Sequence, residues 1–155
     1  MPAVDPSPRI EAIARRLGAL GCSQEQIDAV RRDQGLSLPR SYEVFLRFLG
    51  RDCGGLFQGT DVGFPAVLGQ RDDALDILER YREWKTDCDV FRLPDDAIVI
   101  SMHQGYVFLF LRTSLGDDPP VELWMEGSDH PERSKVIFAS VAEWLEGGVR
   151  PRAEA

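Results

Sequence analysis

His103 is the side chain in this sequence best suited to acid–base catalysis, because an imidazole titrates near neutral pH. Ser101 or Asp95 could lie near it in space, so a small hydrolase using His103 and a carboxylate is one candidate function. No Ser-His-Asp or Cys-His arrangement of recognisable spacing surrounds it, however. The sequence favours the alternative, a turn histidine bonded to backbone, because a catalytic site requires more than one histidine.

The other candidates for chemistry are weaker. His130 could form a metal site with His103 and Asp129, but two histidines without a repeated ligand spacing make a poor ligand set. Cys53 could be a nucleophile, yet only Arg51 beside it in sequence would favour the thiolate. The glycines match no phosphate-binding pattern. We therefore expect no catalytic residue, no metal and no cofactor.

The composition indicates one folded domain spanning residues 1–155. At 43% hydrophobic the chain can bury a sizeable core, which we expect to cover about residues 8–148, with flexible ends at 1–7 and 149–155. The net charge of −8 excludes a general ligand for nucleic-acid backbones and favours a basic protein partner. A charge of this size also serves simply to keep a small domain in solution, and the sequence leaves that alternative open.

Nothing in the sequence predicts export or a membrane location. There is no apolar run of about 18 residues, and the N-terminus lacks the basic and apolar regions of a signal peptide. Three cysteines, far apart and odd in number, form a poor disulfide framework and indicate a reducing compartment. We therefore expect a cytoplasmic protein that makes no membrane contact.

The hydrophobic periodicity changes from helical to strand-like along the chain. Helices come first, an antiparallel meander follows, and one helix closes the domain, which predicts an α+β fold with a mostly antiparallel sheet and helices packed on one face. The continuously apolar run at 106–111 is typical of a strand buried on both faces. The expected helices are 7–20, 23–34, 39–49, 72–84 and 140–146, and the expected strands are a short one near 56–57, then 97–100, 106–111, 121–126 and 136–138.

One segment resembles the "LPxxYxxFL…GG" signature of the Smi1/Knr4 (SUKH) superfamily. It reads Leu38-Pro39-Arg40-Ser41-Tyr42-Glu43-Val44-Phe45-Leu46 and is followed by Gly54-Gly55. The closing Phe138-Ala139-Ser140-Val141-Ala142-Glu143-Trp144-Leu145 is similar to the terminal "S-F-x-E-F-L" helix of that family, with Val141 in place of the common aromatic. We interpret the signature as structural: Tyr42, Phe45 and Leu46 fill the core, Leu38 packs beside the helix start at Pro39, and Gly54 with Gly55 allows the turn into the sheet.

The resemblance implies an α+β domain that acts by binding a protein. Bacterial members of the family are often immunity proteins that neutralise toxins, many of them nucleases or deaminases, and fungal relatives regulate cell-wall synthesis through protein contacts. We therefore expect an immunity protein that binds a basic toxin domain, with a housekeeping scaffold or regulator for a host protein as the alternative.

Polarity and aromatic type, rather than the signature, suggest which residues contact the partner. Acidic side chains would supply electrostatic complementarity, and Tyr106 and Trp124 would be apolar anchors. Trp124 alternates with apparent core residues, so it either points outward or is covered by a helix. The expected contacts are Asp95, Asp96, His103, Tyr106, Glu122, Trp124, Glu126 and Asp129.

Overall fold

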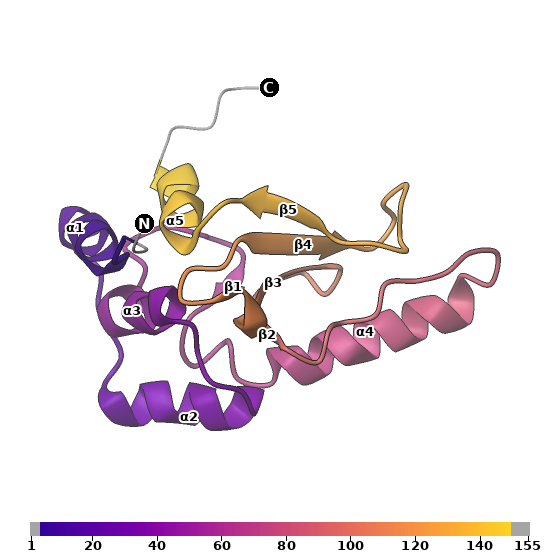
Figure 1. Cartoon of the computed structure of the whole chain (residues 1–155), viewed down its shortest axis with the longest axis horizontal. Coiled ribbons are helices and arrows are strands. Elements are labelled where there is room, and N and C mark those ends of the chain that lie inside the picture. The colour runs from indigo at the N-terminus through magenta and orange to yellow at the C-terminus, as the bar shows by residue number, and fades with distance from the viewer. Residues whose placement is uncertain (1–3, 150–155) are drawn as a thin grey trace.

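The computed structural model describes residues 4–149 and shows five α-helices around one antiparallel sheet (Figure 1). The expected flexible ends fall partly outside this range, since 1–3 and 150–155 are not described. Within the range, Asp5 Oδ1 accepts a hydrogen bond of 3.0 Å from the backbone N–H of Ser7, where the first helix begins. The helices are α1 (Ser7–Leu17), α2 (Gln24–Gln34), α3 (Arg40–Leu49), α4 (Gln70–Trp84) and α5 (Val141–Val149).

The sheet is a meander in which each strand pairs with the next one along the chain. The first strand lies at Asp61–Val62 and not near 56–57, as the sequence predicted. Leu56 and Phe57 instead lie in turns, and the ring of Phe57 stacks on Trp144 of α5, so these apolar residues serve helix packing. The strands are β1 (Asp61–Val62), β2 (Ala97–His103), β3 (Val107–Arg112), β4 (Val121–Met125) and β5 (Lys135–Phe138).

Helices cover both faces of the sheet, which corrects the expectation that they pack on one face. In Figure 1, α1, α2, α3 and α5 gather at the left and α4 runs beneath the strands on the right. The first four share a core with one set of strand side chains: Ile98, Ile100, Leu109, Leu111 and Val121. The alternate side chains pack under α4: Ala97, Val99, Met102, Phe108, Phe110 and Trp124.

The helices cover both faces because of β3, whose side chains are apolar at every position from Val107 to Leu111. A strand of this kind must be covered on both faces, because alternate side chains point to opposite sides. The buried residues of α4 supply the second cover: Ala74, Ile77, Leu78 and Tyr81. The α+β class and the antiparallel order were predicted correctly, and the position of α4 was not.

Helical side chains complete the edge of β2 where β1 is too short to do so. β1 pairs only with Ser101 and Met102, so the outer edge of β2 around Val99 has no strand partner. The Gln34 amide fills this place: its Nε2 donates to the Val99 carbonyl at 2.8 Å, and the Val99 N–H donates to its Oε1 at 3.1 Å. Gln34 therefore satisfies buried backbone groups that a longer β1 would otherwise pair.

The signature segment lies in the core around α3. Tyr42, Phe45 and Leu46 are fully buried, and Phe45 packs against Trp144 of α5. Gly54 and Gly55 follow α3 with φ of +64° and +92°, values that glycine adopts more readily than other residues. The segment thus joins the helical layer to the sheet, as expected of a structural motif.

Candidate partner-binding surface

The sheet register divides the predicted contact residues between two ends of the sheet. Ala97 pairs with Arg112 at one end, here called the proximal end, and His103 pairs with Val107 at the other, the distal end. Six residue steps of β2 separate them, or about 20 Å at the usual rise of a strand. Asp95 and Asp96 precede β2 and lie at the proximal end, whereas His103, Tyr106, Glu126 and Asp129 belong to the distal end.

Asp96 is engaged in local structure at the proximal end. Its carboxylate accepts hydrogen bonds from the hydroxyl and backbone N–H of Ser114 and lies 3.4 Å from Arg112 Nε. These bonds, led by the Ser114 hydroxyl, lower the pKa of Asp96 from its ordinary value. The neighbouring Asp95 is exposed. The proximal pair therefore offers one exposed carboxylate, distant from the other predicted contacts.

Trp124 is buried and cannot serve as a surface anchor, which corrects one predicted contact. Its side chain is 1% exposed, stacks against Phe108 and meets the ring of Tyr81 edge-on at 5.4 Å. Its Nε1–H donates to the carbonyl oxygen of Pro131 at 3.1 Å. The reason is α4, which covers this face of the sheet. Glu122, on the same face, is half-buried and accepts a hydrogen bond of 3.1 Å from the Ser134 hydroxyl.

The exposed tryptophan is Trp84, which sequence reasoning did not select. It is the last residue of α4 and is 74% exposed. Its ring lies 5.8 Å from that of Tyr81, and Lys85 Nζ lies 5.8 Å from its centroid. Spacing places Trp84 on the same side of the helix as Tyr81, three residues earlier. Only the structure shows that this last turn lies beyond the core.

Trp84 forms one wall of a groove of about 570 Å³, here called the Trp84 groove. The loop between β4 and β5 forms another wall, and the segment after α4 also lines the groove. Carboxylates dominate its charge, because Lys85 is the one Lys or Arg among the described lining residues. The residues that define the groove are Tyr81, Trp84, Lys85, Asp87, Cys88, Glu126, Gly127, Ser128, Asp129, Pro131 and Glu132.

The acidic residues of the groove differ in how they are paired. Asp87 lies 3.8 Å from Lys85 Nζ, and Glu132 lies 3.4 Å from His130 Nδ1. Within residues 4–149, Glu126 and Asp129 have no basic side chain within ion-pair distance. A smaller hollow of about 240 Å³ adjoins the groove at Trp84 and Glu126 and includes Gly105, next to Tyr106. The predicted contacts Glu126 and Asp129 therefore lie beside Trp84.

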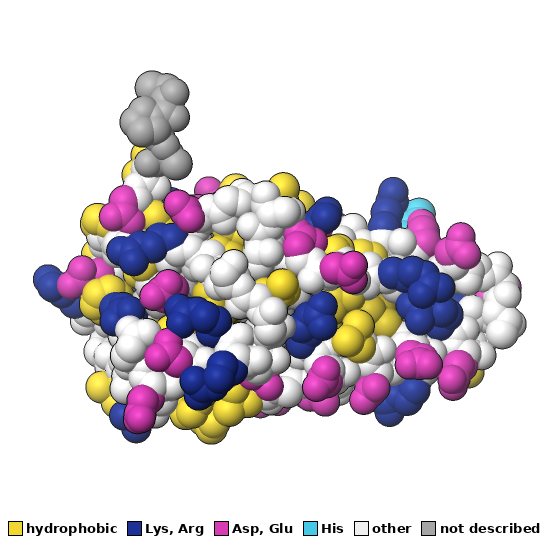
Figure 2. Space-filling view, turned by 60° about the horizontal axis from the view of Figure 1, so that its bottom comes forward, with side chains coloured by type: hydrophobic (Ala, Val, Ile, Leu, Met, Phe, Trp, Pro, Cys, Tyr) yellow, Lys and Arg dark blue, Asp and Glu magenta, His cyan; other side chains and the backbone are white. Residues whose placement is uncertain are grey.

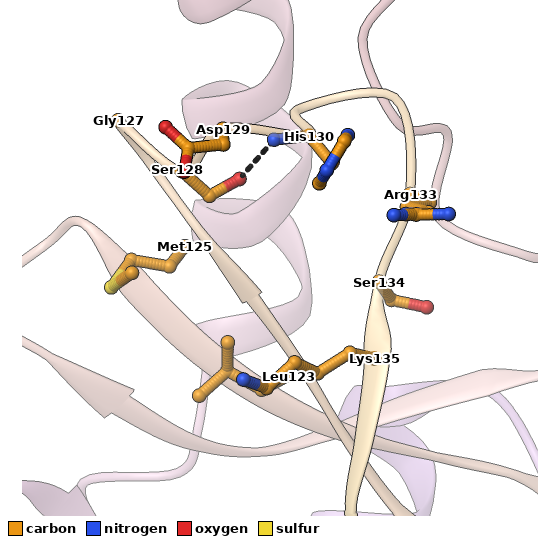
Figure 3. A pocket seen from close by; sticks show the side chains of 9 residues that line it. All are labelled: Leu123, Met125, Gly127, Ser128, Asp129, His130, Arg133, Ser134 and Lys135. Carbon is orange, nitrogen blue, oxygen red and sulfur yellow. Dashed lines mark hydrogen bonds between the residues drawn. The ribbon is translucent and has the colours of Figure 1, made fainter.

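A second hollow, of about 660 Å³, lies on the other side of the same loop (Figure 3). The β4–β5 pairing ends at Leu123 and Lys135, and beyond it the chain segments separate around the hollow. Figure 3 shows the Lys135 side chain reaching toward Leu123 of β4, with Met125 and Arg133 on opposite sides of the view and the His130 backbone N–H bonded to the Ser128 hydroxyl above them. Leu123 and Met125 make it partly apolar. Arg133 and Lys135 make the lining of this hollow basic, whereas the lining of the Trp84 groove is mainly acidic.

His103 is held in a local contact and does not meet the partners that catalysis would need. Its Nδ1 lies 2.9 Å from the Thr60 hydroxyl, and its ring meets Tyr106 edge-on at 5.7 Å. Asp95, the proposed carboxylate, lies at the opposite end of β2, and Ser101 is 3% exposed. The His103–Asp95 pair of the hydrolase alternative is therefore not formed.

The candidate nucleophile Cys53 and the candidate metal site also lack the surroundings that their chemistry requires. The Cys53 thiol donates to the Leu49 carbonyl at 3.3 Å, and burial raises its pKa to about 11, which favours the neutral thiol over the nucleophilic thiolate. Across residues 4–149, no three His, Cys, Asp or Glu side chains are grouped closely enough to hold a metal ion. No helix in this part of the chain is long and apolar enough to cross a membrane.

The fold defines the class as a small α+β domain with one antiparallel meander enclosed by helices on both faces. Within that class, the chain belongs to the SMI1/KNR4 family (SUKH-1), whose family model matches residues 21–147. The match covers the signature segment, the whole sheet and most of the closing helix, and it confirms the resemblance found in the sequence. A search of curated proteins found no match.

Proposed function

We propose that this protein is a non-catalytic binding domain of the immunity type, which neutralises a toxin of the nuclease or deaminase kind by direct contact through its distal end. Membership of the SMI1/KNR4 family is consistent with such a role. The observation that carries the proposal is the exposed Trp84, which lines one groove together with Glu126 and Asp129. Exposed tryptophans beside polar groups are typical anchors of protein interfaces.

Three exposed apolar side chains lie at the distal end. Trp84 is 74% exposed, Met125 39% and Tyr106 37%, and they surround the β4–β5 loop on its two sides. Burying apolar surface stabilises a complex by about 25 cal/mol per Å², and a large ring at the centre of an interface contributes most. We therefore assign the anchoring role expected of Trp124 to Trp84, with Tyr106 retained beside it.

Local charge supports a basic partner more directly than net charge does. Figure 2 shows acidic and basic side chains interspersed over the face it presents, so the charge of −8 is not gathered there into one acidic field. Among the described residues, Glu126 and Asp129 have no basic side chain within ion-pair distance, although Lys85 lines the same groove and Arg80 lines the adjoining hollow. Complementary charges at a binding surface raise the association rate and select the partner. We therefore expect salt to slow association with the toxin.

The test is a binding measurement with the products of neighbouring genes. Wild-type protein should bind a basic toxin domain encoded nearby, and Trp84→Ala should weaken this binding at least about tenfold. Leu115→Ala is the matched control, because Leu115 is 54% exposed but follows β3 at the proximal end. It should bind like wild type.

Two outcomes would reject the proposal in different ways. Trp84→Ala and Tyr106→Ala variants that bind the toxin as tightly as wild type would show that the distal end is not the contact surface. Recovery of a host protein and no toxin would favour the regulator alternative and remove the immunity role. Rising ionic strength should act mainly on the association rate.

A further inference from the structure

We infer that the Trp84 groove receives an arginine side chain presented by a loop of the partner, with the guanidinium stacked on Trp84 and bonded to Glu126 and Asp129. This inference rests on the proposed function, since it specifies the partner chemistry of the same surface. It goes beyond a general preference for basic proteins, because it names one residue type and the groups that would hold it.

The ring of Trp84 already accepts a cation from its own chain. Lys85 Nζ lies 5.8 Å from the ring centroid, within the range of cation–π attraction, and its second contact is Asp87 at 3.8 Å. Both contacts lie at the long end of their ranges, so a cation that fits the ring better can displace Lys85. Lys85 therefore occupies the position that a partner's cation would take, and it competes with that cation.

The β4–β5 loop supplies carboxylates to the same groove, as a cation on the ring would require. Glu126 and Asp129 line the same groove as Trp84, and within residues 4–149 neither has a basic side chain within ion-pair distance. The one basic lining residue, Lys85, is held toward Asp87. A cation entering between Trp84 and the β4–β5 loop would therefore meet two carboxylates that no ion pair engages.

Arginine fits this arrangement better than lysine. A guanidinium is planar, stacks on an indole face and donates several N–H groups in its plane, whereas an ammonium is a compact, strongly hydrated point charge. An aromatic face and carboxylates in one groove match the planar, multiply donating group. The groove, at about 570 Å³, also leaves room for backbone on either side of the arginine, as a protruding loop would have.

The second hollow explains why the arginine enters on one side of the loop only. Gly127, Ser128 and Asp129 line both spaces, but Arg133 and Lys135 line the other one. Neither of these cations has an acidic side chain within ion-pair distance among the described residues. A basic side chain is therefore repelled from the Met125 side and attracted to the Trp84 side of a single loop.

The inference can be tested without the natural partner, by nuclear magnetic resonance of the tryptophan indole N–H groups. The probe is the capped peptide acetyl-Gly-Arg-Gly-amide, and its controls replace arginine by lysine or by uncharged citrulline. Trp84→Phe assigns the Trp84 signal, while the buried Trp124 and Trp144 are internal references. The arginine peptide should shift the Trp84 signal saturably, with affinity at least about fivefold above that of the citrulline peptide.

Three variants locate the binding groups. Glu126→Gln and Asp129→Asn should each weaken binding of the arginine peptide several-fold, because each removes one carboxylate from the groove. Lys85→Met should strengthen it, because the competing cation is gone. All three positions lie at the surface, so the variants should retain the fold, which the unchanged Trp124 and Trp144 signals would verify.

The inference is overturned by equal shifts with the arginine and citrulline peptides, by no shift at Trp84, or by weaker binding in Lys85→Met. These results would leave the proposed function standing if toxin binding still depended on Trp84. Conversely, arginine binding in the groove combined with no toxin partner would support the inference and reject the immunity role. The two proposals can therefore fail separately.

Discussion

The indole nitrogen of Trp124 donates a hydrogen bond of 3.1 Å to the carbonyl oxygen of Pro131. The same carbonyl accepts the backbone N–H of Phe91 at 2.7 Å, so one oxygen joins the sheet, the β4–β5 loop and the segment after α4. Trp124 is buried, but through this bond it helps to position the β4–β5 loop of the proposed binding surface. Its bond ties the loop that carries Asp129 to the sheet and to the segment after α4.

Replacing Trp124 by Phe should loosen the β4–β5 loop as well as destabilise the fold. The variant keeps an aromatic ring but loses the bond to Pro131 and leaves a small cavity, at a cost of about 2–3 kcal/mol in the free energy of unfolding. Urea unfolding and amide hydrogen exchange over residues 126–134 measure the two effects. Trp144→Phe is the control, because Trp144 is equally buried but contacts Phe45 and Phe57. Unchanged exchange at 126–134 in Trp124→Phe would contradict this role.

The two glycines of the signature should differ sharply in their tolerance of alanine. A Cβ on Gly54 would lie 2.6 Å from the Leu17 carbonyl oxygen, whereas one on Gly55 would have no heavy atom within 4 Å. Both have positive φ, so Gly55→Ala should cost about 1 kcal/mol through backbone strain alone. Gly54→Ala adds a clash with backbone and should cost about 3 kcal/mol or more. Equal midpoints of urea unfolding for the two variants would refute this distinction.

Gln34→Leu should destabilise the protein by about 2–4 kcal/mol. It leaves the N–H and carbonyl of Val99 without the amide that pairs them, and unpaired buried groups cost about 1–3 kcal/mol each. Gln58→Leu is the control, since Gln58 is exposed and should change the free energy of unfolding by less than about 0.5 kcal/mol. If urea unfolding gave similar values for the two variants, Gln34 would not complete the β2 edge.

Asp96 should stabilise the fold in a pH-dependent way. Its folded-state pKa lies below the ordinary value, so its contribution is present above pH about 4 and is lost as pH falls through the folded pKa. Asp96→Asn should therefore lower the free energy of unfolding by about 1 kcal/mol at pH 7, with a shrinking difference from wild type in acid. Asp95→Asn, at an exposed position, should show no such trend. A difference for Asp96→Asn that stayed constant from pH 7 to pH 2 would contradict the assignment.

Most of the fold was predictable because it depends on local signals. The helix predicted at 23–34 begins with a capping box, in which the Ser23 hydroxyl accepts the Gln26 N–H and the Gln26 side chain accepts the Ser23 N–H. The run at 106–111 was expected to be buried on both faces, and Phe108 to Leu111 are covered on both, whereas Tyr106 lies in the turn before β3 and is 37% exposed. The place of α4 was not predictable in the same way, because helical periodicity shows that a helix has an apolar side but not which sheet face it meets.

The candidate surface was predicted only in part, for a related reason. Alternation along β4 separates Trp124 from Val121 and Leu123, but it cannot show which face a helix will cover. Trp84 follows Tyr81 at helical spacing, and only the path of the chain places the last turn of α4 past the sheet. Loops then bring Glu126 and Asp129 into the same groove as Trp84, and no local pattern encodes this meeting of segments about 40 residues apart.

The two cores share every central strand, and this fixes the register of β3 against β2. In β3, Leu109 and Leu111 face one core while Phe108 and Phe110 face the other. A slip of β3 by one residue against β2 would exchange leucines for phenylalanines on both sides at once. The length of the connection at 104–106 is under no such constraint, because an extra residue can be taken up in the turn or in a bulge like the one between Val99 and Ser101.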